Sequence, residues 1–186
     1  GGLKILMTGT TAGASRADKA GLLPLFLTWL VSAAEIPTSN QIGVDVMMQI
    51  RYVQKDDREF WFKLDQHLAE NEFEKKIRDK MGYVLLENHT PIDLLRYHLF
   101  WDSIPFCTML FVDWEYQKKG YGRKLMEFWE ADMKALGFGM LMTSTQVDED
   151  AQHFYRKMGY KDSGGLVIDI KGYEQPMEMF LVKAID

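Results

Sequence analysis

The segment that most constrains the fold is Gln-Lys-Lys-Gly-Tyr-Gly at positions 117–122, between two stretches of contrasting pattern. Residues 106–112 before it are apolar and rich in types that suit a buried β-strand. After it, apolar side chains recur on one helical face: Leu125, Phe128, Trp129, Met133 and Leu136. The sequence therefore predicts a strand that turns through glycines into an amphipathic helix.

A turn of this kind can hold an anion. The first N–H groups of a helix have no backbone partner, and that end of the helix is partly positive. Gly120 and Gly122 allow close approach of the backbone and positive φ. The turn is not a dinucleotide fingerprint, because Leu125 stands where a third glycine is needed. It is not a P-loop either, because Arg123 follows Gly122. What remains is the pattern Q-x-x-G-x-G.

A second strand and helix follow. Residues 139–146 have the pattern of a strand, and residues 148–158 that of a helix, with Asp148 as N-cap or first-turn acid. Gly159 ends this helix, as glycine often does just past a C-terminus. One stripe of the helix is formed by Ala151, Phe154, Tyr155 and Met158.

These two segments resemble the two signatures of the GNAT superfamily of acyl-CoA-dependent N-acetyltransferases. The first is Q-x-x-G-x-G at 117–122, and the second is A-x-x-F-Y-x-K-x-G-Y at 151–160. The resemblance covers roughly residues 48–185. It implies a mixed α/β fold with a mostly antiparallel sheet of about six or seven strands, flanked by about four helices. It also implies a V-shaped split between the two central strands, residues 106–113 and 139–146. Where many relatives have glycine, this chain has Asp93, which is expected either to bulge or to face solvent.

The resemblance implies that acetyl-CoA is the cosubstrate. Backbone groups of Phe111 and Val112 would meet the pantetheine arm like an added strand. The pyrophosphate would be held by the loop and first helical turn: Gln117, Lys118, Lys119, Gly120, Tyr121, Gly122 and Arg123. The two lysines either add charge near the phosphates or are simply solvated. The second signature contributes Phe154 and Asp148, an acid where many relatives carry Asn; it can accept a hydrogen bond but not donate one.

The implied chemistry is direct attack of a neutral amine on the acetyl carbonyl. Tyr155 occupies the family's general-acid position and would protonate the departing thiolate; the alternative is a packing residue on the apolar stripe. For the base, His98 is the best candidate by residue type, because its ordinary pKa lies near neutrality. Glu115 and Asp102 are the alternatives. A strand N–H near Phe111 would stabilise the oxyanion.

Composition narrows the classes of function. With a net charge of −5, the chain is a poor general binder of nucleic acid and is better suited to a cationic substrate. Cys107 is the only cysteine, which excludes an intrachain disulfide, and its apolar strand favours an inert thiol. The four histidines lack metal-ligand spacing, so no metal is expected. Two rival functions are a non-catalytic acyl-CoA-binding regulator and an aminoacyl-tRNA-acetylating toxin, the latter supported only by basic clusters at 75–80 and 118–124.

Residues 1–47 lie outside the resemblance and are expected to be an extension, with the acetyltransferase domain at 48–186. The extension could be foreign sequence ahead of Met47 or Met48, a signal peptide, or an ordered helical arm with an apolar face at 22–33. Its apolar run at 20–31 is shorter than the ~20 residues needed to span a bilayer. We expect a cytoplasmic protein, because acetyl-CoA is a cytoplasmic metabolite. Its partner would be a small-molecule or peptide amine, without nucleic acid or membrane, and a homodimer is one option.

Overall fold

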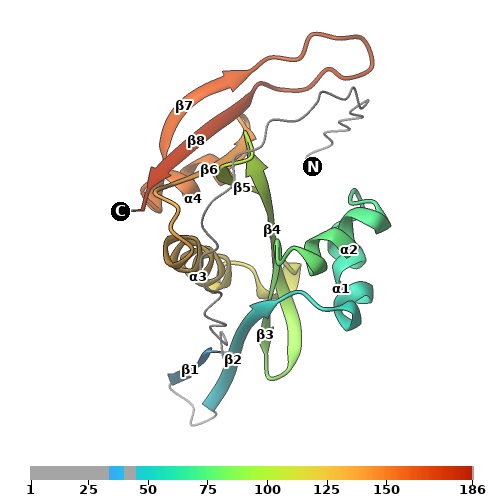
Figure 1. Cartoon of the computed structure of the whole chain (residues 1–186), viewed down its shortest axis with the longest axis vertical. Coiled ribbons are helices and arrows are strands. Elements are labelled where there is room, and N and C mark those ends of the chain that lie inside the picture. Colours follow the sequence, from blue (N-terminus) through green and yellow to red (C-terminus); the bar gives the residue numbers. More distant parts are fainter. Residues whose placement is uncertain (1–33, 40–44, 186) are drawn as a thin grey trace, which may run out of the picture. The chain divides into compact units, whose positions relative to one another are not determined.

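The computed structural model describes residues 34–39 and 45–185. The chain divides into two units, residues 1–32 and 33–186, and the second carries the fold (Figure 1). The helical arm expected at 22–33 lies outside the described residues. No helix in the described ranges is long and apolar enough to cross a membrane.

A single sheet forms the centre of the second unit. In the described part of the chain it has eight strands in the order β1-β2-β3-β4-β5-β6-β8-β7 (Figure 1). Every neighbouring pair is antiparallel except β5 and β6, which are parallel. The strands are β1 (Ala34–Ser39), β2 (Asp45–Tyr52), β3 (Gly82–Glu87), β4 (Thr90–Phe100), β5 (Ile104–Val112), β6 (Met140–Gln146), β7 (Lys161–Leu166) and β8 (Glu178–Ala184).

The helices cover both faces of this sheet. They are α1 (Arg58–Leu64), α2 (Glu70–Arg78), α3 (Tyr121–Ala135) and α4 (Ala151–Lys157), with 3-10 turns η1 (Lys55–Asp57) and η2 (Trp114–Tyr116). Trp129 of α3 and Tyr155 of α4 belong to the core on one face, and Trp61 of α1 and Phe73 of α2 to the core on the other. We call these the α3/α4 face and the α1/α2 face. The mixed, mostly antiparallel α/β fold is confirmed, with β1 as a strand beyond the six or seven expected.

The two central strands part soon after they meet. The parallel ladder between β5 and β6 has two residue pairs, Phe106 with Met142 and Cys107 with Thr143. The Thr143 hydroxyl donates a hydrogen bond of 3.1 Å to the carbonyl of Cys107 and so closes the ladder at its last pair. Beyond that pair β6 continues to bond with β8 alone as far as Gln146. The expected V-shaped split is therefore present.

Several boundaries differ from the sequence pattern. The pattern of residues 166–170 predicts a strand, and this prediction is wrong: β7 ends at Leu166, and the apolar residues after it lie in an exposed loop, with Val167 69% exposed. The helix expected from Asp148 begins at Ala151 instead, with Asp150 as its N-cap. The pattern of residues 92–102 also predicts a strand. The observed strand, β4, is Thr90–Phe100, because Trp101 and Asp102 adopt positive φ in the following turn.

Candidate active site

The turn between β5 and α3 has the geometry of an anion cradle. Gly120 is the N-cap of α3 with φ +86°, and no atom lies within 4 Å of where its Cβ would be. A Cβ on Gly122 would come within 3.2 Å of Val112 Cγ2, so the bare backbone lets the helix start close against β5. No side chain of the described residues caps this end of α3. The first-turn N–H groups therefore point out of an uncapped, partly positive helix end.

Side chains of the cradle divide into inward and outward groups. Gln117 donates from Nε2 to the carbonyl of Val112 at 3.1 Å and thereby ties the loop to its strand. Tyr121 is buried, and its hydroxyl donates to the Glu87 carboxylate, so only its backbone can face an anion. Outside lie three exposed cations: Lys118, Lys119, whose Nζ sits 4.9 Å from the Tyr116 ring centre, and Arg123, 3.3 Å from Glu127.

Two further residues expected at the cofactor lie on the segment that follows β6. Asp148 is exposed in the loop two residues before the Asp150 N-cap. Phe154 is half-buried on α4, with its ring centre 5.3 Å from that of Tyr155. Phe111 and Val112 end β5 on the other side of the split. The expected cofactor residues thus fall on two segments: the end of β5 with the turn and helix start after it, and the segment after β6.

Tyr155 lies under the closed end of the split, on the α3/α4 face. It is buried in the core of that face. Burial raises the pKa of its phenol, the nearby Cys107 thiol adds to the increase, and the Thr143 side chain lowers it. Cys107 and Thr143 are the last residue pair before the strands part. At physiological pH the Tyr155 phenol is therefore neutral, and it lies beside the last residue pair of β5 and β6. Cys107 is an inert buried thiol, because burial raises its pKa to about 12.

A β-bulge sits just beyond the same point on β5. Arg96 pairs with Met109 and Tyr97 with Cys107, so Thr108 is the extra residue. Its hydroxyl accepts a hydrogen bond of 2.9 Å from Arg96 Nη1, and Arg96 Nε is 2.7 Å from the fully buried carboxylate of Asp65. A bulge frees strand backbone groups from the ladder. The irregularity lies three residues before Phe111, near which an oxyanion donor was expected. The sequence pattern did not reveal the pair between Arg96 and Asp65.

His98 lies on β4 in a positively charged neighbourhood. It is exposed, and its ring meets that of Phe106 edge to face at 5.2 Å. Partial burial lowers the pKa of His98, and the charges of Lys76 and Arg96 lower it further. Lys76 is only 9% exposed and donates from Nζ to the carbonyl of Tyr97 at 2.7 Å. Burial lowers the pKa of Lys76 to about 8.

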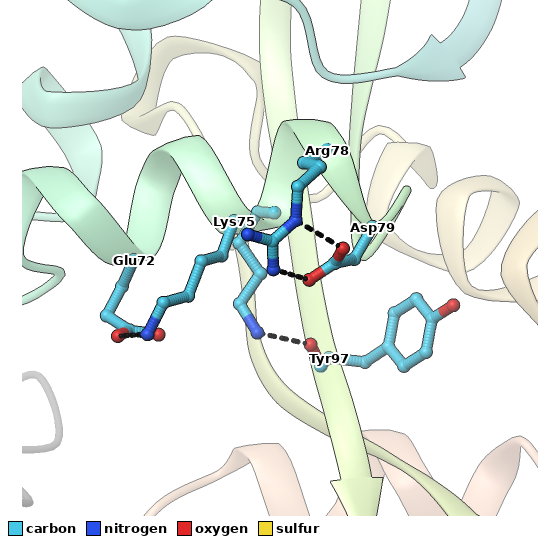
Figure 2. A network of polar contacts seen from close by, with 6 residues as sticks. Glu72, Lys75, Arg78, Asp79 and Tyr97 are labelled. Atoms are coloured by element: carbon cyan, nitrogen blue, oxygen red, sulfur yellow. Dashed lines mark hydrogen bonds and ion pairs between the residues drawn. The ribbon is translucent and has the colours of Figure 1, made fainter.

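Around Lys76, several other charges of α2 are paired at its surface. Figure 2 shows Glu72 with Lys75 and Arg78 with Asp79, beside Tyr97 of β4. The two other base candidates are exposed, as His98 is. Glu115 is exposed on η2, and Asp102 is exposed in the turn before β5, at the end of that strand away from the split.

Comparisons with known proteins agree with this geometry. A family model described as an acetyltransferase (GNAT) domain matches residues 66–162, more than half of the chain. Ard1 from Thermoplasma volcanium has a TM-score of 0.65 at 14% identity, over 74% of this chain and 97% of that chain. The ribosomal-protein-S18-alanine N-acetyltransferase from Escherichia coli has a TM-score of 0.65 at 16% identity, over 75% of this chain and 95% of that chain.

A third structure, yncA from Salmonella typhimurium with its cofactor acetyl-CoA, has a TM-score of 0.60 at 16% identity, over 75% of this chain and 94% of that chain. These likenesses show the fold. A search of curated protein sequences gives no match. The family model includes both signature segments, the cradle at 117–122 and the α4 segment at 151–160. The chain therefore belongs to the GNAT family of N-acetyltransferases.

Proposed function

We propose that this protein transfers the acetyl group of acetyl-CoA to a primary amine of a small molecule or peptide, by direct attack within a ternary complex. The observation that carries the proposal is the split itself. From residue 108 to 112, the edge of β5 that faces away from β4 has no strand partner in the described ranges. Such an edge accepts an extended chain of amides, and the pantetheine arm of acetyl-CoA is one.

The residues at the split fit acetyl-CoA in a consistent order. The pyrophosphate lies on the N–H groups of the first turn after Gly120, with Lys118, Lys119 and Arg123 near enough in sequence to add positive charge. Pantetheine amides bond to the backbone of Phe111 and Val112. Asp148 and Phe154 border the arm from the opposite segment. The Salmonella structure with its cofactor acetyl-CoA supports this choice of cosubstrate.

Proton transfer falls to residues near the closed end of the split. Because its pKa is raised, Tyr155 keeps its proton until the thiolate departs and then protonates it. Because its pKa is lowered, His98 is neutral near pH 7 and can accept a proton from the incoming amine. The C–N bond forms as the C–S bond breaks. The name of the Escherichia coli relative, an alanine N-acetyltransferase of a ribosomal protein, supports a peptide amine as one acceptor class.

A calorimetric titration with acetyl-CoA tests the cradle. Gly120→Glu places a carboxylate at the anion site, and Gly137→Glu is the matched control at the opposite end of α3. Both glycines have positive φ, +86° and +91°, and open space around the missing Cβ, so the backbone strain is alike. We expect micromolar binding in wild type and Gly137→Glu, and at least a tenfold loss in Gly120→Glu. Equal binding by the two variants would refute the cradle, and no binding by wild type would refute the proposed function.

A further inference from the structure

Glu178, the first residue of β8, is a buried carboxyl group without a cationic partner among the described residues. Its backbone lies between Gln146 of β6 and Leu166 of β7. The residue is 1% exposed, and neither carboxylate oxygen has a well-formed hydrogen bond in the part of the chain that the structure describes. Burial raises its pKa, hydrogen bonding by the nearby Ser144 side chain lowers it, and the charge of Glu149 raises it further. No cation is among these influences.

The carboxyl lies beside the point where β5 and β6 part. Side chains alternate along a strand, and residues paired across a ladder share a face. Met179 and Leu181 of β8 belong to the α3/α4 core, so Glu178 and Phe180 face the other way. On that side Phe180 contacts Phe106, with ring centres 6.2 Å apart. Ser144, whose side chain lowers the pKa of Glu178, is the first residue of β6 beyond its last pair with β5.

An uncompensated acid in this position is costly to the fold. A buried carboxylate without hydrogen bonds or a counter-charge destabilises a protein by several kcal/mol or keeps its proton. Buried polar groups are otherwise nearly always paired, and exceptions are concentrated at functional sites. A cation that binds at the split would supply the missing partner. Acceptor amines reach a protein mostly as ammonium ions at neutral pH, and an aliphatic ammonium provides both charge and N–H donors.

We propose that Glu178 binds the ammonium group of the acceptor on the α1/α2 face of the split, and so selects aliphatic, cationic amines. This inference rests on the proposed acetyltransferase function. His98 is less suited to bind the ammonium, because Lys76 and Arg96 place positive charge beside it. It remains the proposed acceptor of the proton that the ammonium must lose before its nitrogen attacks. Tyr155 and Glu178 then approach neighbouring residues of β6, Thr143 and Ser144, from opposite faces of the sheet.

The test uses Glu178→Gln, which keeps the shape and removes the charge. Asp93→Asn is the matched control, because Asp93 is also fully buried with both oxygens unpartnered in the described ranges. Asp93 pairs with Leu85 and Val112, which both belong to the α3/α4 core, so it faces away from the proposed ammonium site. Acetyl-CoA affinity is measured first. Acetylation of butylamine, phenethylamine and 1,5-diaminopentane is then compared with that of aniline, which is neutral at pH 7.

We expect Glu178→Gln to lower kcat/KM for the aliphatic amines at least roughly tenfold, mainly through KM, with acetyl-CoA affinity and the aniline rate unchanged. Asp93→Asn should leave the ratio of aliphatic to aniline rates as in wild type. We also expect Glu178→Gln to raise Tm, because it removes a buried acid that lacks a counter-charge, and Asp93→Asn should raise Tm for the same reason. Equal loss for aliphatic amines and aniline, or no loss, overturns the inference. So does a wild type that binds acetyl-CoA but neither binds nor acetylates any of the aliphatic amines. Failure to bind acetyl-CoA would instead overturn the proposed function.

Discussion

The ion pair of Arg96 and Asp65 gives the sharpest test of how the α1/α2 face is held. Arg96→Met keeps the length of the side chain and removes its charge. Asp65 is 0% exposed, its Oδ2 accepts from Arg96 Nε at 2.7 Å, and its Oδ1 has no partner among the described residues. The variant therefore leaves a buried carboxylate with neither a counter-charge nor that hydrogen bond. Thr108 at the bulge loses the donor that is 2.9 Å from its hydroxyl.

The magnitude follows from burial. Removing one partner of a buried ion pair costs about 3–5 kcal/mol. Arg96 is 18% exposed, so water can enter part of the vacated space, and the lower end of that range, about 3 kcal/mol, is the better value. In a folded unit of roughly 150 residues, 1 kcal/mol corresponds to about 2–4 °C in Tm. We therefore expect Tm to fall by about 6–12 °C.

Thermal and urea unfolding followed by circular dichroism measure this change. Arg58→Met is the matched control, because Arg58 forms a similar pair with Glu70 at 2.6 Å while both side chains are more than half exposed. It should change Tm little, since exposed pairs contribute little. Replacing both buried partners, in Asp65→Leu/Arg96→Met, should recover most of the lost stability. The reasoning is refuted if Arg96→Met is no less stable than Arg58→Met, or if the double variant is no more stable than Arg96→Met.

Two further predictions concern buried acids. Tyr155→Phe should lower kcat by about 10²-fold or more with unchanged acetyl-CoA affinity in calorimetry, because the thiolate loses its proton donor; unchanged kcat would make Tyr155 a packing residue. Burial raises the pKa of Asp93 well above its ordinary value, so the folded state keeps a proton that the unfolded state releases above about pH 4. That penalty is absent below pH 4 and grows as pH rises, by up to about 1.4 kcal/mol per unit, until the folded pKa is reached. In urea titrations, the gain in unfolding free energy of Asp93→Asn over wild type should therefore grow with pH above about pH 4. A gain independent of pH would contradict the assignment of this penalty to the Asp93 carboxyl group.

The features that the sequence predicted are those determined by neighbours along the chain. The cradle is one: two glycines fix positive φ and close approach, and the helical period of α3 begins directly after them. By contrast, β1 (Ala34–Ser39) has little strand pattern and contains Pro37, and it exists as a strand through its pairing with β2. The apolar run at 166–170 misled for the same reason: β7 lies at the edge of the sheet, its pairing with β8 ends at Leu166, and Val167 is exposed.

Long-range contacts explain what the sequence did not reveal at the candidate site. Asp65 and Arg96 lie 31 positions apart, and nothing local marks either as half of a pair. Asp93 was expected to bulge or face solvent. The register shift places the extra residue at Ile92, directly before it, and Asp93 itself is fully buried. Glu178 opens a strand whose pattern is otherwise ordinary, and only the ladder with β6 brings it beside Ser144. An isolated acid at the start of an apolar strand is the one signal that could have pointed to it.

The pairing of β6 with β8 separates the proposed general acid, Tyr155, from the proposed ammonium site at Glu178. Seven residue pairs, from Met140 with Ala184 to Gln146 with Glu178, fix which side chains of β6 face each side of the sheet. A shift of one residue would exchange the two faces and bring Glu178 onto the side of Tyr155. There a carboxylate would compete for the phenol's proton, and an ammonium bound to it would sit on the side from which the thiolate must be protonated. Under the proposed function, the amine would attack from the face of Glu178, while Tyr155 would protonate the leaving sulfur from the other face. The register of one antiparallel ladder, rather than any single side chain, thus keeps the proposed ammonium site and the proposed proton donor on opposite faces of the sheet.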